Sequence, residues 1–220
     1  MRHPALRRRI AAAALATATV VTGCQAHTAD YSSLATTSPR STAESTSAPS
    51  TSPTPIAQHL AGLGVIGQQL PLDELTGITV TLPRPPGWST YDNPNFSPGT
   101  EAIAKNNTYP TALVMAFKLD GNFDVGEALE HADDDAELTK NFKRLNASNA
   151  DFNGFPSAMI EGSYDSGSTR LHAYNRIVIP ATPEFDRYLV QFTVTTLADQ
   201  AAAQAPDVLK VIEGFSVAVK

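Results

Sequence analysis

The composition of the chain changes abruptly at Ile56, and this boundary decides which residues can fold. Residues 24–55 are mainly Ser, Thr, Ala and Pro, with very few large apolar side chains. Such a segment cannot bury enough apolar surface to offset its conformational entropy, so we expect a disordered tether that spans roughly 30 Å. Residues 56–220 show apolar periodicity and turn residues, in a length suited to one domain with a single core.

The first 23 residues have the three zones of a secretion signal. Four arginines precede an apolar run over 10–21, and small residues end at Gly23. A helix of this length rises about 18 Å against roughly 30 Å of hydrocarbon, so we interpret residues 1–23 as a removable signal peptide.

The sequence Val21-Thr22-Gly23-Cys24 resembles the bacterial lipobox, in which the cysteine thiol receives a diacylglyceryl group before cleavage. Because Cys24 is the only cysteine, no internal disulfide can form, and we expect Cys24 to be the lipidation site. The alternative is an ordinary signal with an incidental cysteine.

The expected mature protein is acidic. Its signal contains four arginines and no acidic residue, so removal of residues 1–23 moves the formal net charge from −6 to −10. An acidic chain gains neither counterion release from nucleic acid nor attraction to anionic lipid. We therefore expect no nucleic-acid partner, and we assign membrane attachment to acyl chains on Cys24, in which each buried methylene contributes about 0.8 kcal/mol.

Periodic patterns predict the elements of the domain. The alternation over 78–82 puts three aliphatic side chains on one face of a strand, and the nearly all-apolar 111–117 is typical of a central strand covered on both faces. Asp124 and Glu127 form a capping box that opens a helix through Leu129. The other predicted elements are a helix over 56–63, a helical segment with Leu138, Phe142 and Leu145 on one stripe, a strand over 188–195, and a terminal helix containing Val208, Leu209, Ile212 and Phe215.

A hairpin is predicted from residues 155–164 and 170–179, with a turn through 165–168. The complete set of elements predicts an α+β fold with a mostly antiparallel sheet covered by helices. If Ser166-Gly167 is the two-residue turn, Glu161 faces His172, Met159 faces Tyr174 and Ser157 faces Arg176.

One face of this hairpin is polar and is suited to bind an anionic or sugar head group, because arginine and tyrosine donate hydrogen bonds to such ligands. The alternative is a solvated sheet face with cross-strand ion pairs. The candidate ligand-binding residues are Arg170, His172, Tyr174 and Arg176.

The domain contains no catalytic motif such as Gly-x-Ser-x-Gly or Ser-x-x-Lys. The nearest candidate for a catalytic triad is Ser163, His172 and Asp165. All three lie in one hairpin, where strand spacing should prevent the hydrogen-bond relay from serine to histidine to aspartate. His131 precedes three consecutive aspartates, 133–135, which match no calcium-binding loop and more simply place negative charge at a helix start. We therefore predict no enzyme activity, no metal and no cofactor.

Trp88 is the single tryptophan and follows Pro85-Pro86-Gly87. It is suited to stack on a sugar or to anchor a turn on the core. The second role is the more common one for such a residue.

Several short motifs follow one another along the whole domain. They are Thr81-Leu82-Pro83-Arg84-Pro85-Pro86-Gly87-Trp88, Tyr109-Pro110-Thr111-Ala112, Gly154-Phe155-Pro156-Ser157, Gly162-Ser163-Tyr164, Arg176-Ile177-Val178-Ile179-Pro180 and Tyr188-Leu189-Val190-Gln191. In this order, together with the lipobox and the tether, they resemble the mycobacterial LpqN/LpqT lipoprotein family, nearest to its LpqT branch. The resemblance implies a Mog1/PsbP-like fold, a curved antiparallel sheet flanked by helices. It also implies an actinobacterial envelope lipoprotein, linked to the handling of envelope lipids and without known catalytic residues, so only Cys24 carries over as a functional residue.

These features predict a non-enzymatic lipoprotein on the extracytoplasmic face of the cell membrane, whose domain binds an envelope lipid, a glycolipid or an envelope transport protein. One alternative is a protein-interaction module for an envelope or host partner, which would show an exposed apolar patch. A third class, a hydrolase of envelope esters, would need a serine within hydrogen-bond reach of a histidine in a pocket.

Overall fold

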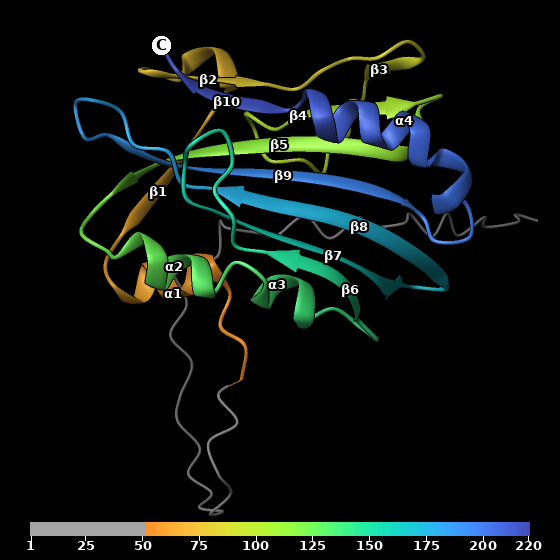
Figure 1. Ribbon diagram of the computed structural model, residues 1–220, viewed down its shortest axis with the longest axis horizontal. Coiled ribbons are helices and arrows are strands. Elements are labelled where there is room, and N and C mark those ends of the chain that lie inside the picture. The colour runs from red at the N-terminus through yellow and green to blue at the C-terminus, as the bar shows by residue number, and fades with distance from the viewer. Residues whose placement is uncertain (1–51) are drawn as a thin grey trace, which may run out of the picture.

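The computed structural model describes residues 52–220 of the chain. The predicted signal peptide, the predicted lipidation site Cys24 and almost all of the predicted tether therefore lie outside the described residues. Within residues 52–220, the strands form an eight-stranded antiparallel sheet and a two-stranded ribbon, with helices packed on both faces of the sheet (Figure 1). The predicted α+β class is confirmed. No helix in this part of the chain has both the length and the apolar character needed to cross a membrane.

The elements follow one another in an order that mixes short helices with long strands. They are α1 (Ile56–Gly62), β1 (Ile66–Leu70), η1 (Leu72–Glu74), β2 (Ile78–Thr81), β3 (Trp88–Thr90), β4 (Glu101–Lys105), β5 (Thr108–Asp120), α2 (Val125–Glu130), α3 (Asp134–Glu137), β6 (Lys143–Ser148), β7 (Ser157–Ser166), β8 (Thr169–Val178), β9 (Arg187–Leu197), α4 (Ala201–Gly214) and β10 (Ser216–Val219). The large sheet has the order β3-β4-β5-β9-β8-β7-β6, with β1 paired to β5, and the ribbon pairs β10 with β2.

Strand β5 separates two apolar cores, as the sequence predicts for a strand covered on both faces. Ala112, Val114 and Ala116 belong to one core cluster, whereas Met115 and Phe117 belong to the other. We call the side of the sheet that carries Val114 the outer face and the side that carries Met115 the inner face. Because successive side chains of a strand alternate, the strand register assigns each residue of the sheet to one of these faces.

Helix α4 and the β10–β2 ribbon cover the outer face. Val211 and Phe215 from the α4 region and Ile78 from β2 are almost fully buried in this core. All three aliphatics of the predicted strand 78–82 are buried, which confirms that prediction. Trp88 is 7% exposed and packs in the same core, so its observed role is the anchor.

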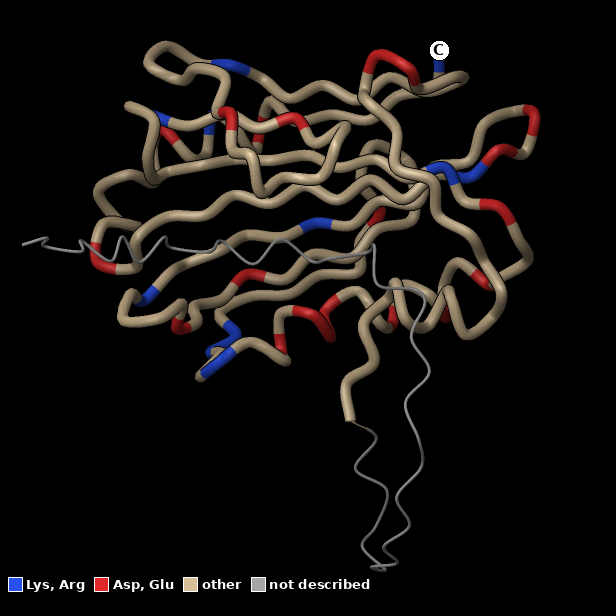
Figure 2. The backbone as a smooth tube through the Cα atoms, turned by 180° about the vertical axis from the view of Figure 1, so that it is seen from behind, with Lys and Arg blue, Asp and Glu red and all other residues tan. Residues whose placement is uncertain are grey.

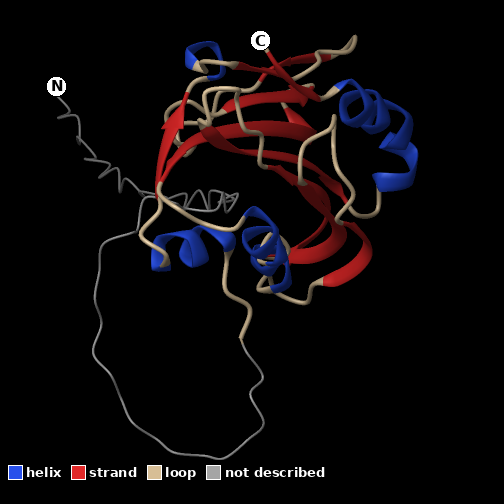
Figure 3. Cartoon of the chain, turned by 60° about the vertical axis from the view of Figure 1, so that its left-hand side comes forward, coloured by secondary structure: helices blue, strands red, loops and turns tan. Residues whose placement is uncertain are grey.

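Helices α1 and α2 cover part of the inner face, on the hollow side of the curved sheet (Figure 3). Ile56 and Leu60 of α1 are buried there, which confirms the predicted first helix. Asp124 caps α2 by accepting a hydrogen bond from the Glu127 backbone N–H at 2.8 Å. This is one of the two bonds that a capping box contains.

The predicted helical stripe of Leu138, Phe142 and Leu145 is wrong. Helix α3 ends at Glu137, Leu138 is 55% exposed, and Leu145 lies in β6, where it is 63% exposed. The backbone has positive φ at Asn141, which an α-helix does not allow, and residues 143–148 pair with β7 instead. Cross-strand hydrogen bonding, which helical spacing cannot reveal, decides the structure of this segment.

Candidate binding surfaces

The polar face predicted for the β7–β8 hairpin exists, with a different pairing. Gly167-Ser168, rather than Ser166-Gly167, forms the turn, so Glu161 faces Tyr174 and Ser163 faces His172. Gly167 has the positive φ that a type II′ turn needs at its first central position. The predicted pairs are therefore wrong by two residues along β8. A shift of two leaves every side chain on its predicted face, since side chains alternate with a period of two.

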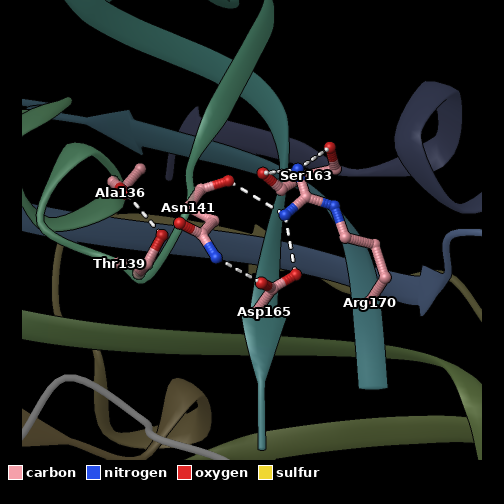
Figure 4. A network of polar contacts seen from close by, with 6 residues as sticks. All are labelled: Ala136, Thr139, Asn141, Ser163, Asp165 and Arg170. Carbon is pink, nitrogen blue, oxygen red and sulfur yellow. Dashed lines mark hydrogen bonds and ion pairs between the residues drawn. The ribbon is translucent and has the colours of Figure 1, made fainter. Parts of the chain in front are cut away.

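Arg170, His172, Tyr174 and Arg176 all point to the outer face, and Arg170 is held there by several bonds (Figure 4). Its guanidinium donates to Asp165 at 2.7 Å, to the Asn141 backbone carbonyl at 2.9 Å and to the Ser163 hydroxyl at 2.8 Å. Asn141 also donates to Asp165, at 2.6 Å. The hydrogen bonds from Arg170 and from Asn141 hold the pKa of Asp165 below its usual range. This network fastens the segment after α3 to the tip of the hairpin.

Arg176 covers the end of an aromatic stack. Its guanidinium carbon lies 4.7 Å from the centre of the Phe152 ring, and its Nε donates to the Tyr174 hydroxyl at 2.7 Å. Phe152 stacks on Phe215, which stacks on Phe192 at 4.1 Å. A ligand at this arginine would have to compete with these contacts, because cation–π and hydrogen-bond partners already surround the group.

The imagined triad does not form a relay in this geometry. His172 Nε2 lies 3.0 Å from the Glu161 carboxylate, whereas Ser163 and Asp165 both bind Arg170. A relay requires the serine hydroxyl on one imidazole nitrogen and the acid on the other. The polar face consists of ion pairs and hydrogen bonds inside the chain.

His131 and its neighbouring aspartates lie where α1, α2 and α3 meet. The His131 ring stacks on His59 at 4.2 Å, and its Nδ1 lies 2.9 Å from Asp134, which also accepts the Thr54 backbone N–H at 2.8 Å. Burial raises the pKa of Asp133 and of Asp135. In residues 52–220, no group of three or more His, Cys, Asp and Glu side chains is arranged to hold a metal ion. Asp134 joins the start of the domain to the α2–α3 region.

The inner face of the same strands is uncharged beyond α1 and α2. Two rows cross β5, β9, β8 and β7 there, and neither contains a charged side chain. Thr193 donates to Asn175 at 2.9 Å within one row. We call the half-buried members of these rows the threonine band: Thr111, Leu113, Ala173, Asn175, Thr193 and Thr195.

Aromatic side chains close one end of the threonine band, at β7. Phe142 packs against Gly162, where an added Cβ would lie 2.5 Å from the ring. Tyr164 lies beyond it, paired with Leu171, and burial raises its pKa, so its hydroxyl stays neutral. Figure 2 shows charged residues in the strands as well as in loops and helices, but the two rows that form the threonine band contain none of them. The band was not predicted from the sequence, although Thr193 and Thr195 alternate with apolar residues there.

A small apolar cavity lies on the same inner face, under α1. Its volume is about 40 Å³, and Leu60, Gly67, Phe117 and Leu189 are among its lining residues. Leu113 of β5 belongs to the threonine band, and Phe117 of the same strand lines the cavity. At about 3.3 Å per residue, the two regions lie roughly 13 Å apart along the strand. The inner face of the sheet thus has a small apolar cavity under α1 and neutral hydroxyl groups in the threonine band.

The fold is a curved antiparallel sheet with helices on both faces, and comparisons with known proteins place it in a family. Residues 52–218 match the family model described as "Probable lipoprotein LpqN". The chain belongs to this lipoprotein family, which confirms the resemblance of its ordered motifs.

Relatives cover most of the chain. It is 53% identical over 170 residues to the putative lipoprotein LpqT of Mycobacterium leprae, with 76% of this chain and 78% of the relative covered. It is 47% identical over 213 residues to the putative lipoprotein LpqT of Mycobacterium tuberculosis, with 96% and 92% covered.

A solved structure shares the fold. The crystal structure of LpqN "involved in cell envelope biogenesis of Mycobacterium tuberculosis" superposes with a TM-score of 0.65 at 18% identity, covering 74% of this chain and 96% of that chain. Cyanobacterial PsbP from Synechocystis and yeast Mog1p are also structural neighbours, with TM-scores of 0.45 and 0.41.

Proposed function

We propose that this protein is a cell-envelope lipoprotein whose domain binds an envelope lipid or glycolipid on the inner face of its sheet, without catalysing a reaction on it. The observation that carries the proposal is the combination of the threonine band with the apolar cavity under α1. An amphiphile presents an apolar chain and a polar head, and the two regions match these parts in order along β5. The named relatives are lipoproteins, and the structural relative is described as involved in cell envelope biogenesis.

The chemistry of the inner face favours a neutral head group. Threonine hydroxyls and the Asn175 amide both donate and accept hydrogen bonds, as sugar or glycerol hydroxyls require. An apolar chain gains about 25 cal/mol for each Å² that it removes from water. The small volume of the cavity implies that α1 shifts outward when a chain enters.

Mass spectrometry of co-purified lipid tests the proposal. The Cys24→Ala chain is secreted from a mycobacterial host, so that no covalent acyl chain obscures the result, and the purified protein is extracted. We expect a non-covalent lipid in near-stoichiometric amount. A clean protein, whose melting temperature no envelope lipid shifts, would contradict the proposal.

Two variants locate the lipid. Gly67→Leu fills the cavity without backbone strain, because an added Cβ makes only ordinary contacts there, and Thr195→Glu places a charge on the band. Both should lower the bound lipid several-fold. The matched control is Thr79→Glu on an exposed position of β2, which should retain it. Equal lipid in all three variants would remove the inner face as the site.

We propose in addition that acyl chains on Cys24 are the membrane anchor. Exported Cys24→Ala protein should appear in the medium instead of the membrane fraction, since two or three acyl chains supply firm attachment and an acidic domain supplies none. Membrane retention of this variant would show that the domain itself binds lipid or a fixed partner.

A second candidate function is protein docking at the β8–β9 loop. Phe185 is 88% exposed with a positive φ, and Thr182 holds the loop through hydrogen bonds with Phe185 and Asp186. A photo-crosslinking residue at position 184, beside Phe185, tests this candidate in intact cells. A single protein partner that is lost when Phe185→Ser is added to the crosslinking chain would support it, and unchanged crosslinking would contradict it.

A further inference from the structure

A cavity of about 240 Å³ lies at the sheet edge where two strands meet end to end. Strand β4 pairs with residues 108–114 of β5, and β1 pairs with residues 116–120 along the same edge. The chain leaves the sheet after β1, returns to it at β3 and reaches β4 through the loop over 91–100, so the edge opens between the end of β1 and the start of β4. The cavity is therefore a product of the topology, and it is separate from the residues of the proposed lipid site.

The walls of the cavity are held in place before any ligand arrives. Gly99 has a φ of +87°, and a Cβ there would lie 3.1 Å from the backbone of Leu70 and Pro71, so glycine lets this wall close on the end of β1. Thr100 accepts a hydrogen bond from the Gln69 amide at 3.2 Å. Tyr91 is one of the lining residues, and its ring packs edge to face on Phe96 at 5.9 Å. Fixed walls reduce the ordering cost of binding.

Three carboxylates line this cavity, and they differ in their partners. Glu101 forms an ion pair with Arg84 at 2.9 Å, and Arg84 also donates to the Thr90 hydroxyl at 2.8 Å. Asp73 and Asp92 have neither a hydrogen bond nor an ion pair within the described part of the chain. The cavity thus offers two carboxylates that accept hydrogen bonds, beside a half-buried aromatic ring.

We propose that this cavity binds the ring of a sugar, with sugar hydroxyls donating to Asp73 and Asp92 and with Tyr91 packing against an apolar face of the ring. Carboxylates only accept hydrogen bonds, so they select a ligand that donates in several directions. Tyrosine contributes a flat apolar surface with a polar end, which fits a sugar ring. The volume is below the usual range of about 300–1,000 Å³ for drug-sized ligands, which limits the occupant to about one ring.

The other ligand classes fit less well. Phosphates and carboxylates would be repelled by Asp73 and Asp92. A hard metal ion takes six or more oxygen ligands, and residues 52–220 contain no cluster suited to hold a metal. An organic ammonium would satisfy the charge but would leave most of the hydrogen-bond acceptors unused, since it donates from one point.

Saturation-transfer NMR on the full chain, solubilised in a sugar-free detergent, tests the proposal. The probes are the methyl glycosides of glucose, mannose, galactose and arabinose, with choline and calcium chloride as competitors. We expect saturable binding of at least one glycoside at millimolar concentration, with little dependence on salt. Failure of all four glycosides to bind, or displacement of the sugar by choline or calcium, would overturn the proposal.

Variants at the walls locate the binding. Asp92→Ala should weaken the glycoside about tenfold or more, since a hydrogen bond to a charged group contributes about 1.5–3 kcal/mol. Tyr91→Ala should weaken it by about 3- to 10-fold, whereas Tyr91→Phe should retain it. Asp151→Ala, on an exposed loop, is the matched control and should bind as wild type does. Equal binding by all four variants would place the sugar elsewhere. None of these residues belongs to the inner-face lipid site, so either proposal can fail alone.

Discussion

Strands β7, β8 and β9 present two different surfaces. On the outer face, Asp165 forms an ion pair with Arg170, and the Glu161 carboxylate lies 3.0 Å from His172 Nε2, so these polar groups have partners inside the chain. On the inner face, the same strands carry the uncharged threonine band, which is left partly open to solvent. A ligand on the outer face would have to displace these contacts. The threonine hydroxyls of the inner band are neutral and half-buried, so a ligand there meets no ion pair. The comparison therefore supports a structural role for the outer face, and it is consistent with the binding that we propose for the inner face.

Truncating the aromatic stack of the outer face should give the largest difference in the free energy of unfolding between variants of the two faces. Phe192→Ala removes a fully buried ring that contacts Phe215 and Tyr174, and we expect a loss of about 3–5 kcal/mol in the free energy of unfolding. The neighbouring inner-face change Thr193→Ala removes one hydrogen bond and should cost about 0.5–1.5 kcal/mol. Chemical denaturation measures both. Equal costs would break the comparison.

The closed end of the threonine band should be the next most sensitive place. Gly162→Ala puts a Cβ 2.5 Å from the Phe142 ring and 2.7 Å from the Lys143 carbonyl oxygen, so we expect a loss of about 1–3 kcal/mol by overpacking. Gly62→Ala in α1 meets no atom within 4 Å and should be neutral or stabilise by up to about 1 kcal/mol. Thermal unfolding of the pair checks the result, and an unaffected Gly162→Ala protein would contradict the packing of Phe142.

The ion pair between Asp165 and Arg170 should make the free energy of unfolding depend on pH. The pKa of Asp165 is lowered in the folded state, so its carboxylate stabilises the fold above the unfolded pKa of about 3.9. This contribution is lost as the pH falls through the lowered folded pKa. The stability difference between wild type and Asp165→Asn should therefore be constant near neutral pH and shrink in acid.

Denaturation curves over a series of pH values measure this difference. Asp151→Asn, on an exposed loop, is the matched control, and its difference from wild type should not follow the same profile. A difference for Asp165→Asn that persists unchanged to low pH would show that Arg170 holds the loop without the ionised carboxylate.

The smallest effect should come from the Glu161–His172 pair. Its side chains are 32% and 20% exposed, and pairs of this kind contribute about 0–1 kcal/mol. Glu161→Gln should lower the free energy of unfolding by no more than this, and a double-mutant cycle with His172→Ala measures the coupling. A coupling well above 1 kcal/mol would show that the outer face depends on this pair more than its exposure implies.

Local patterns predicted much of the fold. The apolar run over 111–117 was placed correctly in a central strand, and the Asp124 cap was found because it depends on residues three apart. The stripe of Leu138, Phe142 and Leu145 failed, because three apolar residues at helical spacing do not exclude an edge strand. Residues 143–148 form a strand because they pair with β7, which begins at Ser157.

For the polar face of the β7–β8 hairpin, local patterns again predicted one property, and cross-strand pairing decided another. The shared face of Arg170, His172, Tyr174 and Arg176 was predictable, since it depends only on alternation. Their partners were not, because a turn displaced by one residue changes every cross-strand pair by two. The threonine band was missed because threonines at alternate positions are also typical of an ordinary solvated strand.

The sequence by itself determined the α+β class, which residues alternate in the strands, and which lipoprotein family the chain belongs to. These properties depend on composition, on short-range periodicity and on motif order. Only the tertiary structure decided that Arg170 is paired with Asp165 on the outer face, that the inner band is partly open, and that β1 and β4 leave a cavity between their ends. Each of these depends on segments far apart in the chain, and their contacts are set by packing around both cores rather than by any local pattern.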